Sequence, residues 1–192
     1  MITHIWDFIV RMLPGGIVAL LAYFALLPLR RRRLLSVGQT SPLHREIILL
    51  LFFLFCGGMA AITLTPRWFH WLIVLTDGTS EPFFQLGTFN LIPFRTFALD
   101  PWSVMILLGN VILFFPIGFF CILLWRRNSW KHILLIGFLT AFCIEVTQLF
   151  VGRTFDIDDI LLNTVGVLLG GLFCLLLRHM IPSLHAVQVQ DT

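Results

Sequence analysis

The sequence predicts an all-α membrane protein, a polytopic bundle of about five transmembrane helices, and three observations lead to this class. Hydrophobic residues make up 58% of the 192 residues and charged residues only 12%, which leaves too little polar surface to cover a soluble globule of this size. The mean hydropathy is +0.95. Apolar runs recur along the chain, most of them close to the ~20 residues that a helix needs to cross a hydrocarbon core.

The first apolar run extends from Leu13 to Leu29 and opens with Pro-Gly-Gly at positions 14–16. This opening predicts an interfacial amphipathic lead-in, from Trp6 to Met12, that turns into the bilayer at the Pro-Gly pair. A basic run at positions 30–33 follows the apolar stretch instead of preceding it. That order favours an uncleaved first span over a cleavable signal peptide.

Four further spans follow, and they divide the chain into three parts. Residues 1–45 hold the N-terminal segment, the first span and a basic cytoplasmic loop, residues 46–180 a helical membrane domain, and residues 181–192 a cytoplasmic tail. An outer loop between the second and third spans contains Asn90-Leu-Ile-Pro-Phe94, an apolar segment expected to lie in the membrane interface beside Arg95. The four spans are expected at Ile47 to Leu64, Trp102 to Trp125, Ile133 to Val151 and Ile160 to Leu177.

The basic residues predict the orientation. Under the five-span arrangement nine of the 13 basic residues share one side, and the positive-inside rule places that side in the cytoplasm. The N-terminus is then outside and the C-terminus inside. The nine residues are Arg30 to Arg33, Arg45, Arg126, Arg127, Lys131 and Arg178.

Charge, cysteines and the absence of repeats argue against several classes of function. The net charge is only +3, and most basic residues sit in short loops, so nucleic acid is not an expected partner. All four cysteines fall inside apolar stretches without a CxxC pair, which predicts reduced packing residues. No cofactor is expected. Nothing repeats internally, so a transporter built from inverted repeats has no support.

Polar residues gather in the outer halves of the last three spans. Glu145 and Gln148 lie three residues apart on one face of the fourth span, and Asn163 lies on the glycine-bearing face of the fifth. Asn110 of the third span could complete the cluster. A lipid-facing carboxylate at this depth would cost on the order of 2.5–3.5 kcal/mol, so Glu145 must face protein or water. The competing interpretation is interhelical hydrogen bonding, in which the amides only hold the helices together.

The turn between the fourth and fifth spans packs four charges into seven residues: Arg153, Asp156, Asp158 and Asp159. Three like charges this close repel one another unless something positive intervenes. Arg153 can pair with Asp156, Asp158 can cap the fifth span at the positive end of its dipole, and a divalent cation or a cationic ligand can take the rest. The three aspartates are the candidate ligands of a metal, although a D-x-D-D string lacks the spacing of a dedicated calcium loop.

In three places these residues resemble the recurring pattern of the VanZ-like membrane proteins. The resemblance covers roughly Ala60 to Arg178, and residues 1 to about 45 carry none of it. The matching pieces are Asn90-Leu-Ile-Pro-Phe94, the stretch from Asn110 to Gly118 that ends in Phe-Phe-Pro-Ile-Gly, and Glu145…Gln148…Gly152-Arg153…Phe155-Asp156-Ile-Asp158-Asp159…Asn163…Gly166.

The resemblance implies a bacterial plasma-membrane protein of a group named for an accessory factor in teicoplanin-type glycopeptide resistance. It does not bring a molecular mechanism with it. Carried over residue by residue, the pattern marks Asn90, Pro93, Asn110, Pro116, Glu145, Gln148, Arg153, Asp156, Asp158, Asp159 and Asn163.

The favoured hypothesis is a protein that binds or modulates an amphiphile at an outer-leaflet polar site. A polar floor below a belt of Phe and Trp suits a ligand with one polar and one apolar end. The candidate partners are membrane lipids, lipid-linked envelope precursors or a lipoglycopeptide, and a homo- or hetero-oligomer is possible. The candidate ligand-binding residues are Asn90, Arg95, Asn110, Glu145, Gln148, Arg153, Asp156, Asp159 and Asn163.

The alternative is a lipid-headgroup hydrolase or transferase. In that hypothesis Asp156, Asp158 and Asp159 hold a metal against a phosphate, and Glu145 acts as general acid and base. No Ser-His, Cys-His or His-rich metal set accompanies these carboxylates in the sequence, which weakens the enzyme hypothesis.

Overall fold

The computed structural model describes residues 2–64, 85–95, 103–125, 130–187 and 190–191. Within these ranges five helices are long and apolar enough to cross a membrane, which confirms the predicted class. They are α1 (Ile2–Ser36), α2 (Leu43–Leu64), α5 (Ser103–Leu124), α6 (Trp130–Phe150) and α7 (Ile157–Met180). The shorter elements are β1 (Gln39–Thr40), β2 (Phe89–Asn90), β3 (Phe155–Asp156), the 3₁₀ helix η1 (Pro182–Val187) and β4 (Gln190–Asp191).

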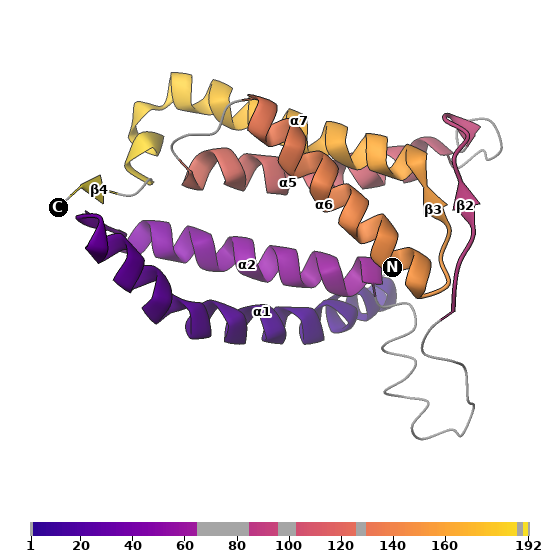
Figure 1. Ribbon diagram of the computed structural model, residues 1–192, viewed down its shortest axis with the longest axis horizontal. Coiled ribbons are helices and arrows are strands. Elements are labelled where there is room, and N and C mark those ends of the chain that lie inside the picture. Colours follow the sequence, from indigo (N-terminus) through magenta and orange to yellow (C-terminus); the bar gives the residue numbers. More distant parts are fainter. Residues whose placement is uncertain (1, 65–84, 96–102, 126–129, 188–189, 192) are drawn as a thin grey trace.

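The helices form two groups that lie side by side (Figure 1). α1 packs along α2, while α7 packs extensively against α5 and also against α6. The two groups meet where α2 touches α5 and α6. Long helices are expected here because a backbone in hydrocarbon must satisfy its hydrogen bonds within its own segment.

Small residues let α5 and α7 approach to backbone contact. A Cβ added to Gly170 would overlap the carbonyl of Phe115, and a Cβ added to Gly118 would overlap the carbonyl of Val167. The expectation that the glycine-bearing face of the last span is its packed face is therefore confirmed. Close backbone approach replaces the hydrophobic driving force, which is weak between helices in lipid.

The first span is longer than expected. α1 continues without interruption through Pro14 and Pro28, so the expected turn at the Pro-Gly pair is wrong. A break inside hydrocarbon would leave several backbone groups unpaired, whereas a proline removes a single helical hydrogen bond. Packing against α2 also supports the helix at this level, because Gly15 and Gly57 lie in backbone contact.

Short strands close the two ends of the bundle (Figure 1). β1 pairs antiparallel with β4 near the C-terminus, and β2 pairs parallel with β3 at the opposite end. The N-terminal end of α1 lies at the β2–β3 end. Much of the connection between α2 and α5, including residues 65–84 and 96–102, lies outside the described residues, as do Arg126 and Arg127.

A glycine pair on α5 tests the packing between α5 and α7. Gly118→Ala is expected to destabilise the protein by about 1–3 kcal/mol, because its methyl group must displace the backbone of α7. Gly109→Ala on the same helix is the control, since a Cβ there meets nothing within 4 Å. That variant is expected to be neutral or up to about 1 kcal/mol more stable. Thermal unfolding in detergent measures both, and equal midpoints would contradict the packing argument.

Candidate functional site

The polar residues meet at the end of the bundle where α6 ends and α7 begins. α6 ends in a Schellman motif, in which the N–H of Arg153 donates to the Gln148 carbonyl at 3.0 Å and the N–H of Gly152 donates to the Leu149 carbonyl at 3.4 Å. Gly152 has a φ of 78°, a conformation that costs a glycine little. This turn brings β3 back to the end of the bundle.

β3 lies in parallel register beside β2, with Asn90 opposite Asp156. Asn90 Nδ2 donates to Asp156 Oδ2 at 2.9 Å, and Asp156 Oδ1 accepts the backbone N–H of Asp158 at 2.9 Å. Asp156, and not Asp158, is therefore the N-cap of α7. Asp156 is the cap because it belongs to β3 and so has the extended backbone that an N-cap requires (φ −119°, ψ 122°).

Glu145 ties α6 to the start of α7. Its side chain is 1% exposed, and its Oε2 accepts the backbone N–H of Asp156 at 3.0 Å. The expectation that this acid faces protein or water instead of lipid is confirmed. Glu145 thus fixes the residue that in turn caps α7.

Asp158 is also fully buried and holds the segment after β2. Its Oδ1 accepts the backbone N–H of Phe94 at 2.7 Å. Phe94 has a φ of 64°, which a bulky residue adopts at a cost on the order of 1–3 kcal/mol. The hydrogen bond to a buried carboxylate offsets this cost, so the NLIPF segment is anchored to α7 through Asp158.

Asp159 and Asn163 line the start of α7 that faces α5. Asn110 Nδ2 donates to Asp159 Oδ1 at 2.5 Å, so Asn110 joins the cluster as the sequence suggested. Asn163, one turn further along, is 3% exposed. Its Oδ1 has no hydrogen-bond partner among the residues that the structure describes, and the same is true of Asn90 Oδ1.

Arg153 and Gln148 bind the C-terminal end of α2. Arg153 Nη1 and Gln148 Nε2 each donate to the carbonyl of Thr63 at 3.0 Å. Among the described residues Arg153 makes no ion pair with the aspartates, so the suggested pairing with Asp156 is not formed. Arg95 is exposed and likewise forms no ion pair within the described ranges.

The contribution of Thr63 was not predicted from the sequence. Its signal is positional: the last four carbonyls of a helix lack helical partners, and cations favour the negative end of the helix dipole. The carbonyl that receives these donors therefore comes from the end of α2. Nothing in the side chain of a threonine reveals that role.

Among the contacts described above, the site offers many acceptors and few charged donors. Glu145 and Asp159 lie close enough to interact electrostatically with each other, with Asp156 and with Arg153. The five donors described above as reaching the four carboxylates are uncharged N–H or NH₂ groups. Within the described part of the chain, no group of three His, Cys, Asp or Glu side chains could hold a metal.

The chain matches the family model of VanZ/LLP1 over residues 16–178. This match covers most of the chain and begins within α1, earlier than the motifs read from the sequence. Neither the curated proteins nor the solved structures contain a match.

Substitutions at Asp156 test its capping role. Asp156→Ala is expected to lower the free energy of unfolding by about 1–3 kcal/mol, because the cap and the Asn90 contact are both lost. Asp156→Asn should cost less than half as much, since its oxygen still caps α7 and its NH₂ can donate to the Asn90 oxygen once the Asn90 amide turns over; that oxygen has no partner among the described residues. Chemical or thermal unfolding in detergent measures both. Equal losses in the two variants would show that the charge, and not the cap, is what stabilises the turn.

Proposed function

The chain belongs to the VanZ/LLP1 family, and we propose that its polar end binds the hydrogen-bond-donating headgroup of an amphiphilic cell-envelope molecule. Two chemical sources fit the proposal, a lipid-linked envelope precursor and a lipoglycopeptide of the teicoplanin type. Both carry hydroxyl or amine donors at one end and an apolar chain at the other. Binding such a molecule, or modulating its access to a target, is the proposed activity.

The observation that carries the proposal is the Asn163 side chain, which is 3% exposed and whose Oδ1 has no partner among the described residues. A buried polar group without a partner costs about 1–3 kcal/mol. Asn90 Oδ1 adds a second acceptor of the same kind, close to the carboxylate of Asp156. A ligand that supplies hydroxyl or amine donors would relieve this imbalance.

Exposed apolar side chains beside the cluster support an amphiphilic ligand. Leu91, Ile92 and Phe94 are 60%, 61% and 64% exposed, and they directly follow β2. Phe94 is anchored to Asp158, so the apolar segment is held next to the acids. A molecule with an acyl or polyprenyl chain could contact both surfaces at once.

The proposed location is the outer leaflet of a bacterial plasma membrane. Arg30 to Arg33, Arg45 and Arg178 belong to the end of the bundle opposite β2 and β3. The positive-inside rule assigns that end to the cytoplasm. The polar site and the N-terminus then face outward, and the C-terminus faces inward.

Binding measurements on purified protein test this function. The probes are a fluorescent teicoplanin-type lipoglycopeptide and a polyprenyl-linked muropeptide precursor, each titrated in mild detergent. Glu145→Gln keeps the acceptor for the Asp156 N–H but removes the charge, and it is expected to weaken binding at least roughly tenfold. Thr147→Val is the control on the same helix, because Thr147 is exposed and, within the described residues, its hydroxyl donates to its own helix at the Cys143 carbonyl.

Two results would contradict the proposal. If Glu145→Gln binds both probes with unchanged affinity and unfolds normally, the polar cluster has only a structural role in joining α6 and α7. Metal-dependent turnover of a polyprenyl phosphate that disappears in Asp156→Asn would identify the hydrolase alternative instead.

A further inference from the structure

A second charged cluster lies at the opposite end of the bundle, between α1 and α2. Glu46, which is 8% exposed, is its centre. Its Oε2 accepts a hydrogen bond from the Tyr23 hydroxyl at 2.6 Å and forms an ion pair with Arg30, and its Oε1 accepts the Ser41 hydroxyl at 2.5 Å. Arg45 lies on the other side, with Nη1 3.8 Å from Glu46 Oε1.

The cluster carries more positive charge than this one acid can compensate. Arg30 and Arg45 contact the single carboxylate, and Arg31, which lines a cavity together with Glu46, forms no ion pair within the described residues. Arg30 Nη1 and Arg45 Nε are buried donors without an acceptor in the described part of the chain. Burying a charged donor without a partner is costly, so this end of the bundle has an excess of positive charge and of donors.

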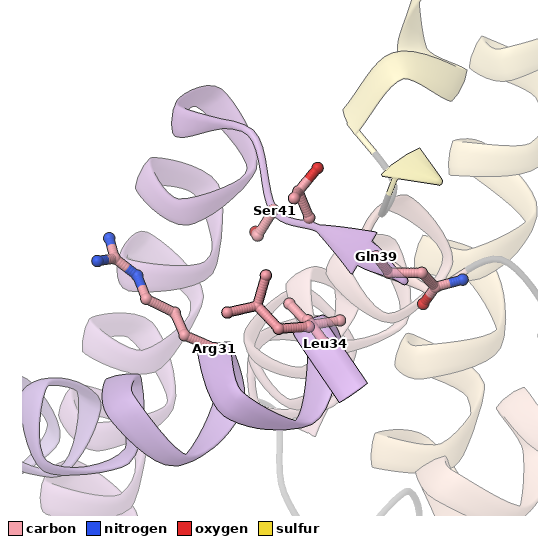
Figure 2. A pocket seen from close by; sticks show the side chains of 6 residues that line it. Arg31, Leu34, Gln39 and Ser41 are labelled. Atoms are coloured by element: carbon pink, nitrogen blue, oxygen red, sulfur yellow. The ribbon is translucent and has the colours of Figure 1, made fainter. Parts of the chain in front are cut away.

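Two adjoining cavities lie along this cluster and share Arg31 and Ser41. The larger, of about 380 Å³, is lined by Glu46 and Tyr23 and by apolar side chains of both helices, such as Leu27 and Leu50. The smaller, of about 190 Å³, lies beside β1. Figure 2 shows this smaller cavity, with Arg31 extending from α1 on one side and Gln39 on the opposite side.

We propose that this groove between α1 and α2 binds an anionic glycerophospholipid of the cytoplasmic leaflet. The phosphate would lie against Arg31, which lines both cavities. One acyl chain would follow the apolar lining along Leu27 and Leu50. Basic pockets between transmembrane helices on the cytoplasmic side are suited to anionic headgroups, and guanidinium groups match phosphate geometry.

The apolar lining distinguishes a lipid from a free phosphate compound. Phe24 and Ile47, which also line the larger cavity, are 56% and 51% exposed. Their exposed surface is available to a hydrocarbon chain and offers nothing to a small hydrophilic anion. The groove is separate from the polar site at β2 and β3, so its occupancy is independent of the function proposed above.

Native mass spectrometry of the full chain in detergent tests the proposal with three probes: phosphatidylglycerol, phosphatidylcholine with the same acyl chains, and glycerol phosphate. The wild-type protein is expected to bind phosphatidylglycerol several-fold more tightly than phosphatidylcholine and to bind glycerol phosphate weakly. Arg31→Gln is expected to reduce phosphatidylglycerol affinity roughly fivefold. Arg32→Gln is the matched control, because it removes the same charge from the next position, which lines neither cavity.

A second variant tests the acyl-chain part of the groove independently. Leu27→Trp fills the larger cavity and is expected to release phosphatidylglycerol while all the arginines remain. Equal binding of the two lipids, equal losses in Arg31→Gln and Arg32→Gln, or full retention in Leu27→Trp would each overturn the proposal. Glycerol phosphate that binds as tightly as the lipid would also overturn it, in favour of a soluble anion site.

Discussion

The polar end of the molecule depends on one constraint: a carboxylate buried beside hydrocarbon must receive hydrogen bonds. Glu145 and Asp158 are each 1% exposed, and an uncompensated charge at such a position costs several kcal/mol. Both acids obtain their donors from backbone N–H groups, at Asp156 and Phe94. The acids therefore determine the path of the chain around them, and β3, the start of α7 and the NLIPF segment follow from these contacts.

The same end also joins the two helical groups. α1 and α2 form a pair of their own, and their direct packing against the other three helices is limited. The Thr63 carbonyl, at the end of α2, receives both Gln148 and Arg153. A helix terminus with unpaired carbonyls thus becomes the attachment point for the turn that carries the acids. The site and the junction between the groups are built from the same few residues.

Local signals in the sequence were sufficient for the spans, the packed glycine face and the membership of Asn110 in the cluster. Apolar length and helical spacing carry that information. The partners were not predictable, because Asn90 and Asp156 are 66 residues apart and meet through strand register. The turn predicted at Pro14 was wrong, because the need for backbone hydrogen bonds in lipid overrides the tendency of proline to end a helix.

The parallel register of β2 and β3 has a consequence for the order of assembly. Phe89 and Asn90 are synthesised before α5 and α6, and their partners Phe155 and Asp156 come after both helices. Two crossings return the chain to the face from which it left, whereas one or three would not. This pair of strands can therefore form only after both helices have entered the bilayer in the correct directions. Its presence at the end of the bundle shows that α5 and α6 have both crossed, before α7 begins.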